Sequence, residues 1–252
     1  AKESRRGTYP RFLLGEASYW TVIGTDSDKE EALISEDGAI EVGPRLFSIE
    51  PVLTDRAEVL TWAHARTTQS LRGSEALVRR EHKSCALTVS AKPLRVNNTP
   101  WLIATYTLEA LQDVPDKSCS LRLLPRPIQV NPSYQFLSNP GGAGSIQEVG
   151  ALADRTRIVT RRTHRDIFSS PSPATRAASP FQRGDEFFEL GVVTSTLGVG
   201  QSVSDSTGLA SGCLAYRVHA LRAGETFEVL LAIPLRDGDY DLPVPAAQLR
   251  AW

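Results

Sequence analysis

The stretch TFEVLLAIP at residues 226–234 decides the class of fold. Apolar side chains occupy every second position from Phe227 to Ile233. The polar residues Thr226 and Glu228 occupy the first two of the alternate positions. Because successive side chains of a strand point to opposite faces, this pattern predicts a strand with one face against a core. The apolar spacing of an amphipathic helix is nearly absent from the rest of the chain, so the sequence predicts an all-β protein.

Short apolar runs of this kind recur along the chain and are separated by turn residues. Asp37-Gly38 predicts a hairpin between runs 32–35 and 39–42. Ala153-Asp154 predicts a second hairpin, between runs 145–149 and 156–160. Roughly fifteen to eighteen such runs, spaced about eight to twelve residues apart, favour a large antiparallel β-sandwich over alternating strands and helices.

Four segments give further expectations about local structure. The runs 101–111 and 118–124 predict an antiparallel pair, and residues 12–14 predict a short strand. Residues 169–183 are rich in serine, proline and alanine, which is typical of an exposed loop. The tail 242–252 carries helix-forming residues after two prolines. We therefore expect a sandwich domain at 1–241 and the start of a linker helix at 242–252.

The composition of the 252 residues restricts the possible partners. The formal net charge of −1 provides no field that would attract nucleic acid or an anionic membrane, so we expect neither partner. The three cysteines fit no zinc spacing and are expected to be small buried side chains, and no metal or other cofactor is predicted. The first residues contain no apolar segment of the signal-peptide type, which is typical of a cytoplasmic protein or of a trimmed one.

One long segment, RPIQVNPSYQFLSNPGG at 126–142, is neither a helix nor a central strand, because its prolines fix φ and lack an N–H donor. We call it the crossover. Sugars are bound by aromatic faces together with planar amide or guanidinium groups. The crossover supplies this set of candidate carbohydrate-binding residues: Arg126, Gln129, Asn131, Tyr134, Gln135, Phe136 and Asn139.

The crossover also resembles a motif of large bacterial proteins related to glycogen-debranching enzymes and (α/α)6-toroid glycosidases. The resemblance continues upstream through YWTVIG (19–24), EEALISEDGAIEV (30–42), FSIEPVL (47–53) and TWAHARTTQSL (61–71). It implies the N-terminal β super-sandwich of such proteins, which has the galactose-mutarotase-like fold. It further implies a non-catalytic domain that packs on a following helical (α/α)6 domain, contributes to the sugar site, and has an oligosaccharide or polysaccharide as its ligand.

Two other functions remain open from the residues. A self-contained sugar epimerase or lyase would need a histidine acid and a carboxylate base, with His164 or His219 as the histidine. A purely structural or interaction sandwich would bury Tyr134 and Phe136. Glu50 interrupts an apolar strand, and we expect it to form an ion pair with an arginine such as Arg66 or Arg126.

Overall fold

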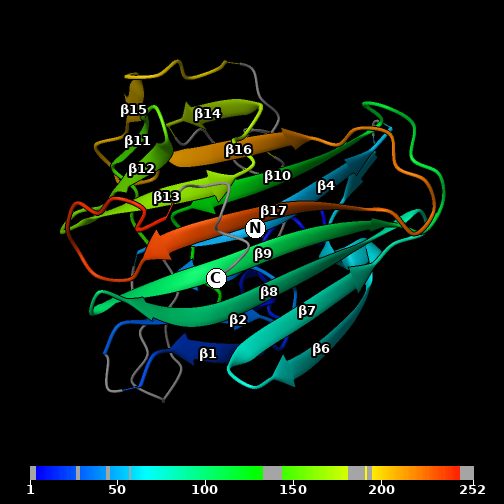
Figure 1. Ribbon diagram of the computed structural model, residues 1–252, viewed down its shortest axis with the longest axis horizontal. Coiled ribbons are helices and arrows are strands. Elements are labelled where there is room, and N and C mark those ends of the chain that lie inside the picture. The colour runs from blue at the N-terminus through cyan, green and yellow to red at the C-terminus, as the bar shows by residue number, and fades with distance from the viewer. Residues whose placement is uncertain are drawn as a thin grey trace.

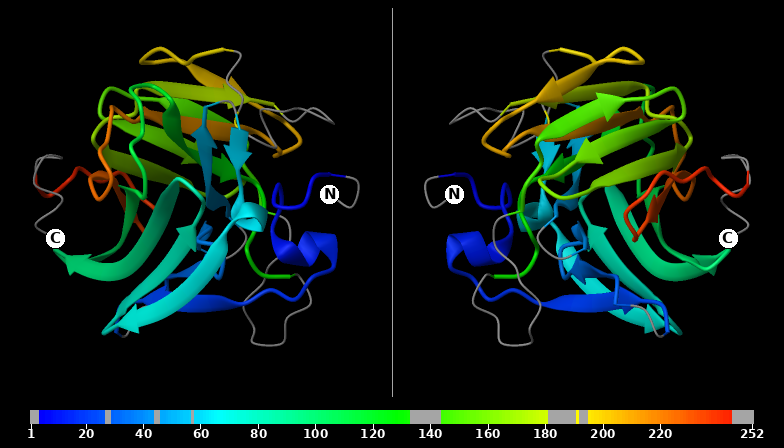
Figure 2. Two further views of the ribbon diagram at one scale, coloured as in Figure 1. Left: turned by 90° about the vertical axis from the view of Figure 1, so that its right-hand side faces the viewer. Right: turned by 90° about the vertical axis from the view of Figure 1, so that its left-hand side faces the viewer.

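The computed structural model describes residues 4–26, 29–43, 46–56, 58–132, 144–180, 191 and 195–244. These residues form two antiparallel β-sheets that lie face to face, as Figures 1 and 2 show. Two 3-10 helices accompany the sheets, η1 (Arg11–Leu14) and η2 (Trp62–His64). The described part of the chain therefore confirms the prediction of an all-β sandwich.

The first sheet has eight strands in the order β1-β2-β3-β4-β10-β16-β14, with β5 also paired to β4. Its strands are β1 (Trp20–Gly24), β2 (Glu31–Ser35), β3 (Ile40–Val42), β4 (Ser48–Asp55), β5 (Glu58–Leu60), β10 (Cys119–Arg126), β14 (Thr175–Ser179) and β16 (Ser211–Arg217).

The second sheet has nine strands in the order β15-β11-β12-β13-β17-β9-β8-β7-β6. Its strands are β6 (Arg66–Arg72), β7 (Glu75–Glu81), β8 (Cys85–Val96), β9 (Thr99–Ala110), β11 (Glu148–Ala151), β12 (Arg155–Val159), β13 (His164–Ser170), β15 (Ser202–Ser204) and β17 (Thr226–Pro234). Strand β1 ends the first sheet and β6 ends the second, and both lie at the same end of the sandwich (Figure 1).

The main core fills the space between the sheets, and β17 shows how alternation builds it. Val229, Leu231 and Ile233 belong to this core, as the pattern of the strand predicts. Leu230 and Ala232 point to the opposite, outer face of the nine-stranded sheet and belong to a separate apolar cluster. Burial of apolar side chains contributes about 25 cal/mol per Å². Because β17 buries apolar side chains on both of its faces, both faces contribute to the stability of the fold.

The predicted hairpins are present. Between β2 and β3, the Gly38 N–H donates to the Ser35 carbonyl at 3.0 Å, and Gly38 has φ of +80°. A residue with a Cβ is disfavoured in this left-handed conformation, so the turn requires a glycine. β11 and β12 form the second hairpin around Asp154. Cys85, Cys119 and Cys213 are buried and free of disulfides, as predicted.

Three local predictions are wrong. β9 and β10 are not a pair: β9 lies between β8 and β17, and β10 lies between β4 and β16 in the other sheet. The segment between β9 and β10 is long enough to cross from one sheet to the other. An isolated β-bridge between Val114 and Leu221 fixes the path of this segment.

Residues 169–183 are not a single exposed loop, because part of the segment forms strand β14 with Ala177 and Ala178 buried. Small side chains pack well on a covered sheet face even where the composition is typical of a loop. Residues 12–14 belong to the 3-10 helix η1 instead of a strand. The tail beyond residue 244 lies outside the described residues, so the linker helix stays a prediction.

Candidate functional site

The described start of the crossover is fastened to the outer face of the eight-stranded sheet. Arg126 ends β10 and is only 1% exposed. Its guanidinium forms an ion pair with Glu50 of β4, in which Nε donates to Glu50 Oε1 at 3.0 Å and Nη2 donates to Glu50 Oε2. Nη2 also donates to the Thr8 carbonyl at 2.9 Å. The predicted ion pair of Glu50 with Arg126 is therefore present and buried.

A second carboxylate, Glu41 of β3, receives the next residues of the crossover. The Gln129 Nε2 donates to Glu41 Oε1 at 2.6 Å, and the Val130 N–H donates to Oε2 at 3.1 Å. Glu41 is buried, and this burial raises the pKa of its carboxyl to about 8, although the hydrogen bonds from the crossover act in the opposite direction. Glu41 thus combines a buried position with a pKa near neutrality.

The seven predicted sugar-binding residues fall into two groups. Arg126, Gln129 and Asn131 are buried and form the base of the crossover. Tyr134, Gln135, Phe136 and Asn139 lie outside the described residues. Carbohydrate binding by this set stays a prediction, and the described residues of the set are engaged in contacts with the eight-stranded sheet.

The N-terminal segment covers the same sheet face next to the crossover. The Arg11 guanidinium donates to both oxygens of Asp37, at 2.9 Å and 2.8 Å, and lies 4.2 Å from the centroid of the Trp62 ring. Beneath it, a cavity of about 20 Å³ is lined by Arg80, Arg126 and Glu50 among others. Arg80 donates to the carbonyls of Pro51 and Leu60, at 3.0 Å and 3.3 Å. These contacts tie the N-terminal segment and Arg80 to this region of the fold.

The histidines occupy four different environments. The His164 ring lies 3.4 Å from Asp239, whereas His219 is exposed and lies 3.7 Å from Asp116. His82 is buried, and this burial lowers the pKa of its ring to about 4. The fourth histidine, His64, accepts at Nδ1 from the N–H of Thr61, the residue that caps η2, at 3.1 Å.

His164 belongs to an ion-pair network on the outer face of the nine-stranded sheet. Ligand atoms of His164, Asp166 and Asp239 lie within 4.8 Å of one another, which is close enough for one metal ion. Arg157 already holds both oxygens of Asp166, at 2.8 Å and 2.9 Å, and holds Asp239 at 2.6 Å. Because Arg157 pairs with both carboxylates and Arg155 also pairs with Asp166 at 3.3 Å, the donor set suits an ion-pair network better than a cation site.

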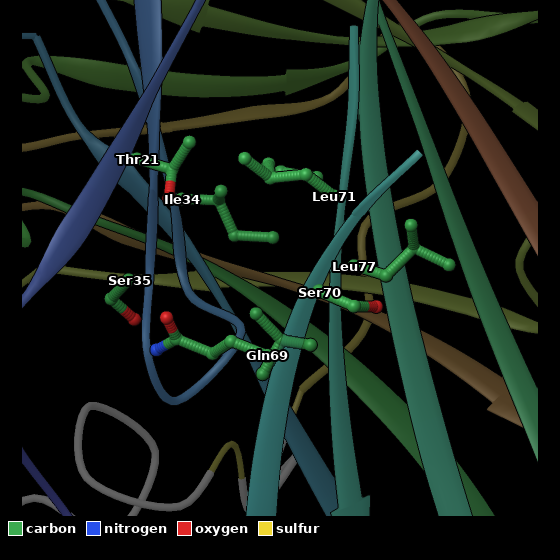
Figure 3. Close-up of a pocket in the computed structure, with 9 residues that line it drawn as sticks. Thr21, Ile34, Ser35, Gln69, Ser70, Leu71 and Leu77 are labelled. Atoms are coloured by element: carbon green, nitrogen blue, oxygen red, sulfur yellow. The ribbon is translucent and has the colours of Figure 1, made fainter. Parts of the chain in front are cut away.

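A groove opens between the two sheets at the end where β1 and β6 lie. We call it the edge groove; its volume is about 190 Å³. Figure 3 shows the Gln69 amide extending from β6 toward Ser35 of β2, with Thr21 of β1 opposite Leu71. The lining residues are Thr21, Ile34, Ser35, Gln69, Ser70, Leu71, Ala76, Leu77 and Val78.

Sequence reasoning did not identify the edge groove. Its two walls come from strands that are more than thirty residues apart in the sequence, and its polar members are ordinary strand residues. The one available signal is the polar run RTTQS at 66–70, which is unusual for a strand packed on both faces and is typical of a sheet edge.

Comparison with solved structures places the fold in the galactose-mutarotase-like class of β super-sandwiches. The chain is similar to a bacterial glucoamylase complexed with acarbose, with a TM-score of 0.55 and 13% identity over 87% of this chain and 36% of the glucoamylase chain. It is also similar to a candidate aldose 1-epimerase from Escherichia coli K12, with a TM-score of 0.50 and 11% identity over 86% of this chain and 99% of that chain.

These neighbours confirm the fold that the resemblance implied. The chain spans about a third of the glucoamylase that it matches. No protein-family model and no curated protein matches the sequence. The described part of the chain contains no helix with the length and apolar character that crossing a bilayer requires.

Proposed function

We propose that the chain is a non-catalytic β-sandwich domain of a carbohydrate-active protein, which packs on a helical catalytic domain. One observation carries this proposal: the similarity to the glucoamylase covers 87% of this chain but only 36% of that one. A sandwich that corresponds to one part of a larger sugar-processing protein fits a supporting domain, and the TM-score of this match, 0.55, exceeds the 0.50 of the match that covers 99% of the candidate aldose 1-epimerase.

The anchored C-terminal segment supports a domain boundary near residue 241. Arg155 donates to the Tyr240 carbonyl at 2.6 Å and to Asp241 at 3.1 Å. The Tyr240 ring meets Trp101 of β9 edge-on, with 6.0 Å between centroids. These contacts fix the path of the segment over the outer face of the nine-stranded sheet, so any following domain would start from a defined position.

The crossover is the proposed contact with sugar or with the helical domain. Arg126, Gln129 and Asn131 hold its base against the eight-stranded sheet, and Tyr134, Gln135, Phe136 and Asn139 provide the contacting side chains. An aromatic ring stacked on the CH face of a sugar contributes about 1 kcal/mol, so loss of one ring weakens binding by roughly tenfold at most.

Calorimetric titration of maltohexaose into the full chain tests this proposal. We expect binding that Tyr134→Ala weakens by about fivefold to tenfold, with no change in Val199→Ala, which removes an exposed side chain elsewhere. Absence of binding to maltohexaose, cellohexaose and xylohexaose would contradict the carbohydrate function. Binding that Tyr134→Ala leaves unchanged would exclude the crossover as the contact.

A second candidate, a self-contained sugar epimerase, is favoured by the proximity of His164 to Asp239. It requires the histidine to deliver a proton and the carboxylate to remove one. The interconversion of α-D-galactose and β-D-galactose, followed by polarimetry, separates the two candidates. The supporting-domain proposal predicts a rate equal to that of buffer, whereas an accelerated rate that His164→Ala abolishes would establish the epimerase.

A further inference from the structure

The edge groove has the lining of a binding site for an uncharged ligand. None of its nine lining residues carries a charge. The side chains of Thr21 and Gln69 make no hydrogen bond within the described part of the chain. The Ser35 hydroxyl accepts from the N–H groups of Asp37 and Ala39, at 3.2 Å and 3.1 Å, and retains its own proton for donation.

We propose that the edge groove binds one glycosyl unit of a neutral oligosaccharide. Each sugar hydroxyl is both a donor and an acceptor, and the Thr21 hydroxyl and the Gln69 amide offer both functions. Binding therefore satisfies polar groups that have no protein partner in the described chain and needs no charged ligand. The groove volume of about 190 Å³ matches a single ring in scale and is below the roughly 300 Å³ at which pockets for larger ligands begin.

Apolar surface in and beside the groove suits the CH faces of a sugar ring. Ile34 and Val78 form part of the lining, and Leu71 is 69% exposed. Tyr19 is 65% exposed and directly precedes β1, and strand alternation places it on the same side as Thr21. An exposed tyrosine next to free hydroxyl and amide groups is the combination that recognises carbohydrate.

The alternative occupant is a second copy of the chain, paired along the free edge of β6. An antiparallel pair centred on Gln69 would place Arg66 of one copy directly opposite Arg72 of the other, at both ends of the pair. Like charges directly opposite each other destabilise a strand pair, and charged side chains on edge strands prevent this kind of association. The charge pattern of β6 therefore favours a sugar over a second copy.

Binding of maltohexaose and cellohexaose to the full chain, with groove variants, tests the proposal. We expect Gln69→Ala and Thr21→Ala each to raise the dissociation constant by about fivefold to tenfold, because each removes a hydrogen bond to the ligand. Leu71→Ala should weaken binding as well. Val199→Ala is the matched control, because Val199 is 68% exposed and Leu71 is 69% exposed, and its binding should equal that of the wild type.

Three results would overturn the proposal. One is an absence of binding to both oligosaccharides by a wild-type chain with a cooperative unfolding transition. Another is binding that none of the groove variants weakens. The third is a wild-type dimer in sedimentation that Leu71→Asp dissociates, which would assign the groove to a second copy.

The ligand class is shared with the proposed function, but the residues are different, so the two can fail separately. Weakening by Tyr134→Ala alone supports the crossover and excludes the edge groove. Weakening by Gln69→Ala alone does the opposite. Additive weakening in the Tyr134→Ala, Gln69→Ala double variant supports two separate contacts with the sugar.

Discussion

The outer faces of the two sheets are covered in different ways. Over the eight-stranded sheet, the crossover and the N-terminal segment are held by buried groups, namely the Arg126–Glu50 pair and the Glu41 carboxyl. Over the nine-stranded sheet, the segment 237–241 is held by Arg155 and Arg157, which share the buried Asp166 and each pair with further exposed carboxylates, Asp241 and Asp239. The segments over the eight-stranded sheet depend on buried groups that have few alternative partners. We call the Arg155 and Arg157 network over the nine-stranded sheet the clamp, because each of its arginines pairs with more than one carboxylate and can lose one of them. Disruption of the contacts over the eight-stranded sheet should therefore cost more.

The largest effect is expected from Arg126→Ala. It leaves the Glu50 carboxylate without its cation inside the protein, which typically costs about 3–5 kcal/mol in the free energy of unfolding. Urea unfolding followed by tryptophan fluorescence measures this loss. In the Arg126→Met, Glu50→Gln double variant no charge is left unpaired, so much of the stability should return. A loss below about 1 kcal/mol in Arg126→Ala would mean that the pair behaves like a surface ion pair.

A smaller effect is expected from Asp166→Asn on the other sheet. The Asp166 side chain is fully buried between Arg155 and Arg157, but both arginines keep other partners such as Asp154 and Asp239. We expect a loss of about 1–3 kcal/mol in the free energy of unfolding, measured by urea unfolding. Asp241→Asn is the matched control: its side chain is 95% exposed, and the loss should be within about 1 kcal/mol. Equal losses in the two variants would contradict the account of the clamp.

Glu41 gives the crossover a dependence on pH. The pKa of its carboxyl is raised to about 8 from 4.5, so the folded protein retains a proton that the unfolded chain releases. Stability therefore falls as pH rises between these values, by at most about 1.4 kcal/mol per pH unit. The lowered pKa of His82, about 4 against 6.5, has the opposite sign, and stability from this group rises with pH below 6.5.

The Glu41→Gln variant isolates the contribution of Glu41, because the contribution of His82 is the same in the variant and in the wild type and cancels in their difference. Between pH 6.5 and 8 we expect the wild type to lose stability while Glu41→Gln does not, so the variant gains relative to the wild type. Urea midpoints at pH 6.5, 7 and 8 measure the difference. The amide that replaces the Glu41 carboxyl in this variant does not titrate between pH 6.5 and 8. A constant difference between the two proteins across this range would contradict the raised pKa of Glu41.

Local chemistry explains what the sequence predicted correctly. The hairpin at Asp37-Gly38 depends on a turn that needs a glycine. The cost of burying an unpaired charge in an apolar strand predicts an arginine partner for Glu50, with Arg66 and Arg126 both open as that partner. The alternation in β17 correctly predicts that Val229, Leu231 and Ile233 face the core between the sheets. These inferences require only neighbouring residues or a single strong interaction.

The remaining features depend on contacts between distant segments. Alternation shows that 101–111 and 118–124 are strands but does not select their partners, so the sheet change between β9 and β10 was missed. Glu41 lies between Ile40 and Val42 and reads as the exposed position of an alternating strand. It is buried because the crossover, almost ninety residues later, covers that face. The edge groove likewise requires the arrangement of both sheets.

Both proposed sites require that the sandwich binds a neutral oligosaccharide. Titration of maltohexaose into the ¹⁵N-labelled chain, followed through backbone amide shifts, tests it most directly. We expect saturable shifts confined to the crossover and to the β1, β2 and β6 residues of the edge groove, with no change along β11, β12 and β15. Amides that remain unmoved throughout the chain at millimolar oligosaccharide would contradict it.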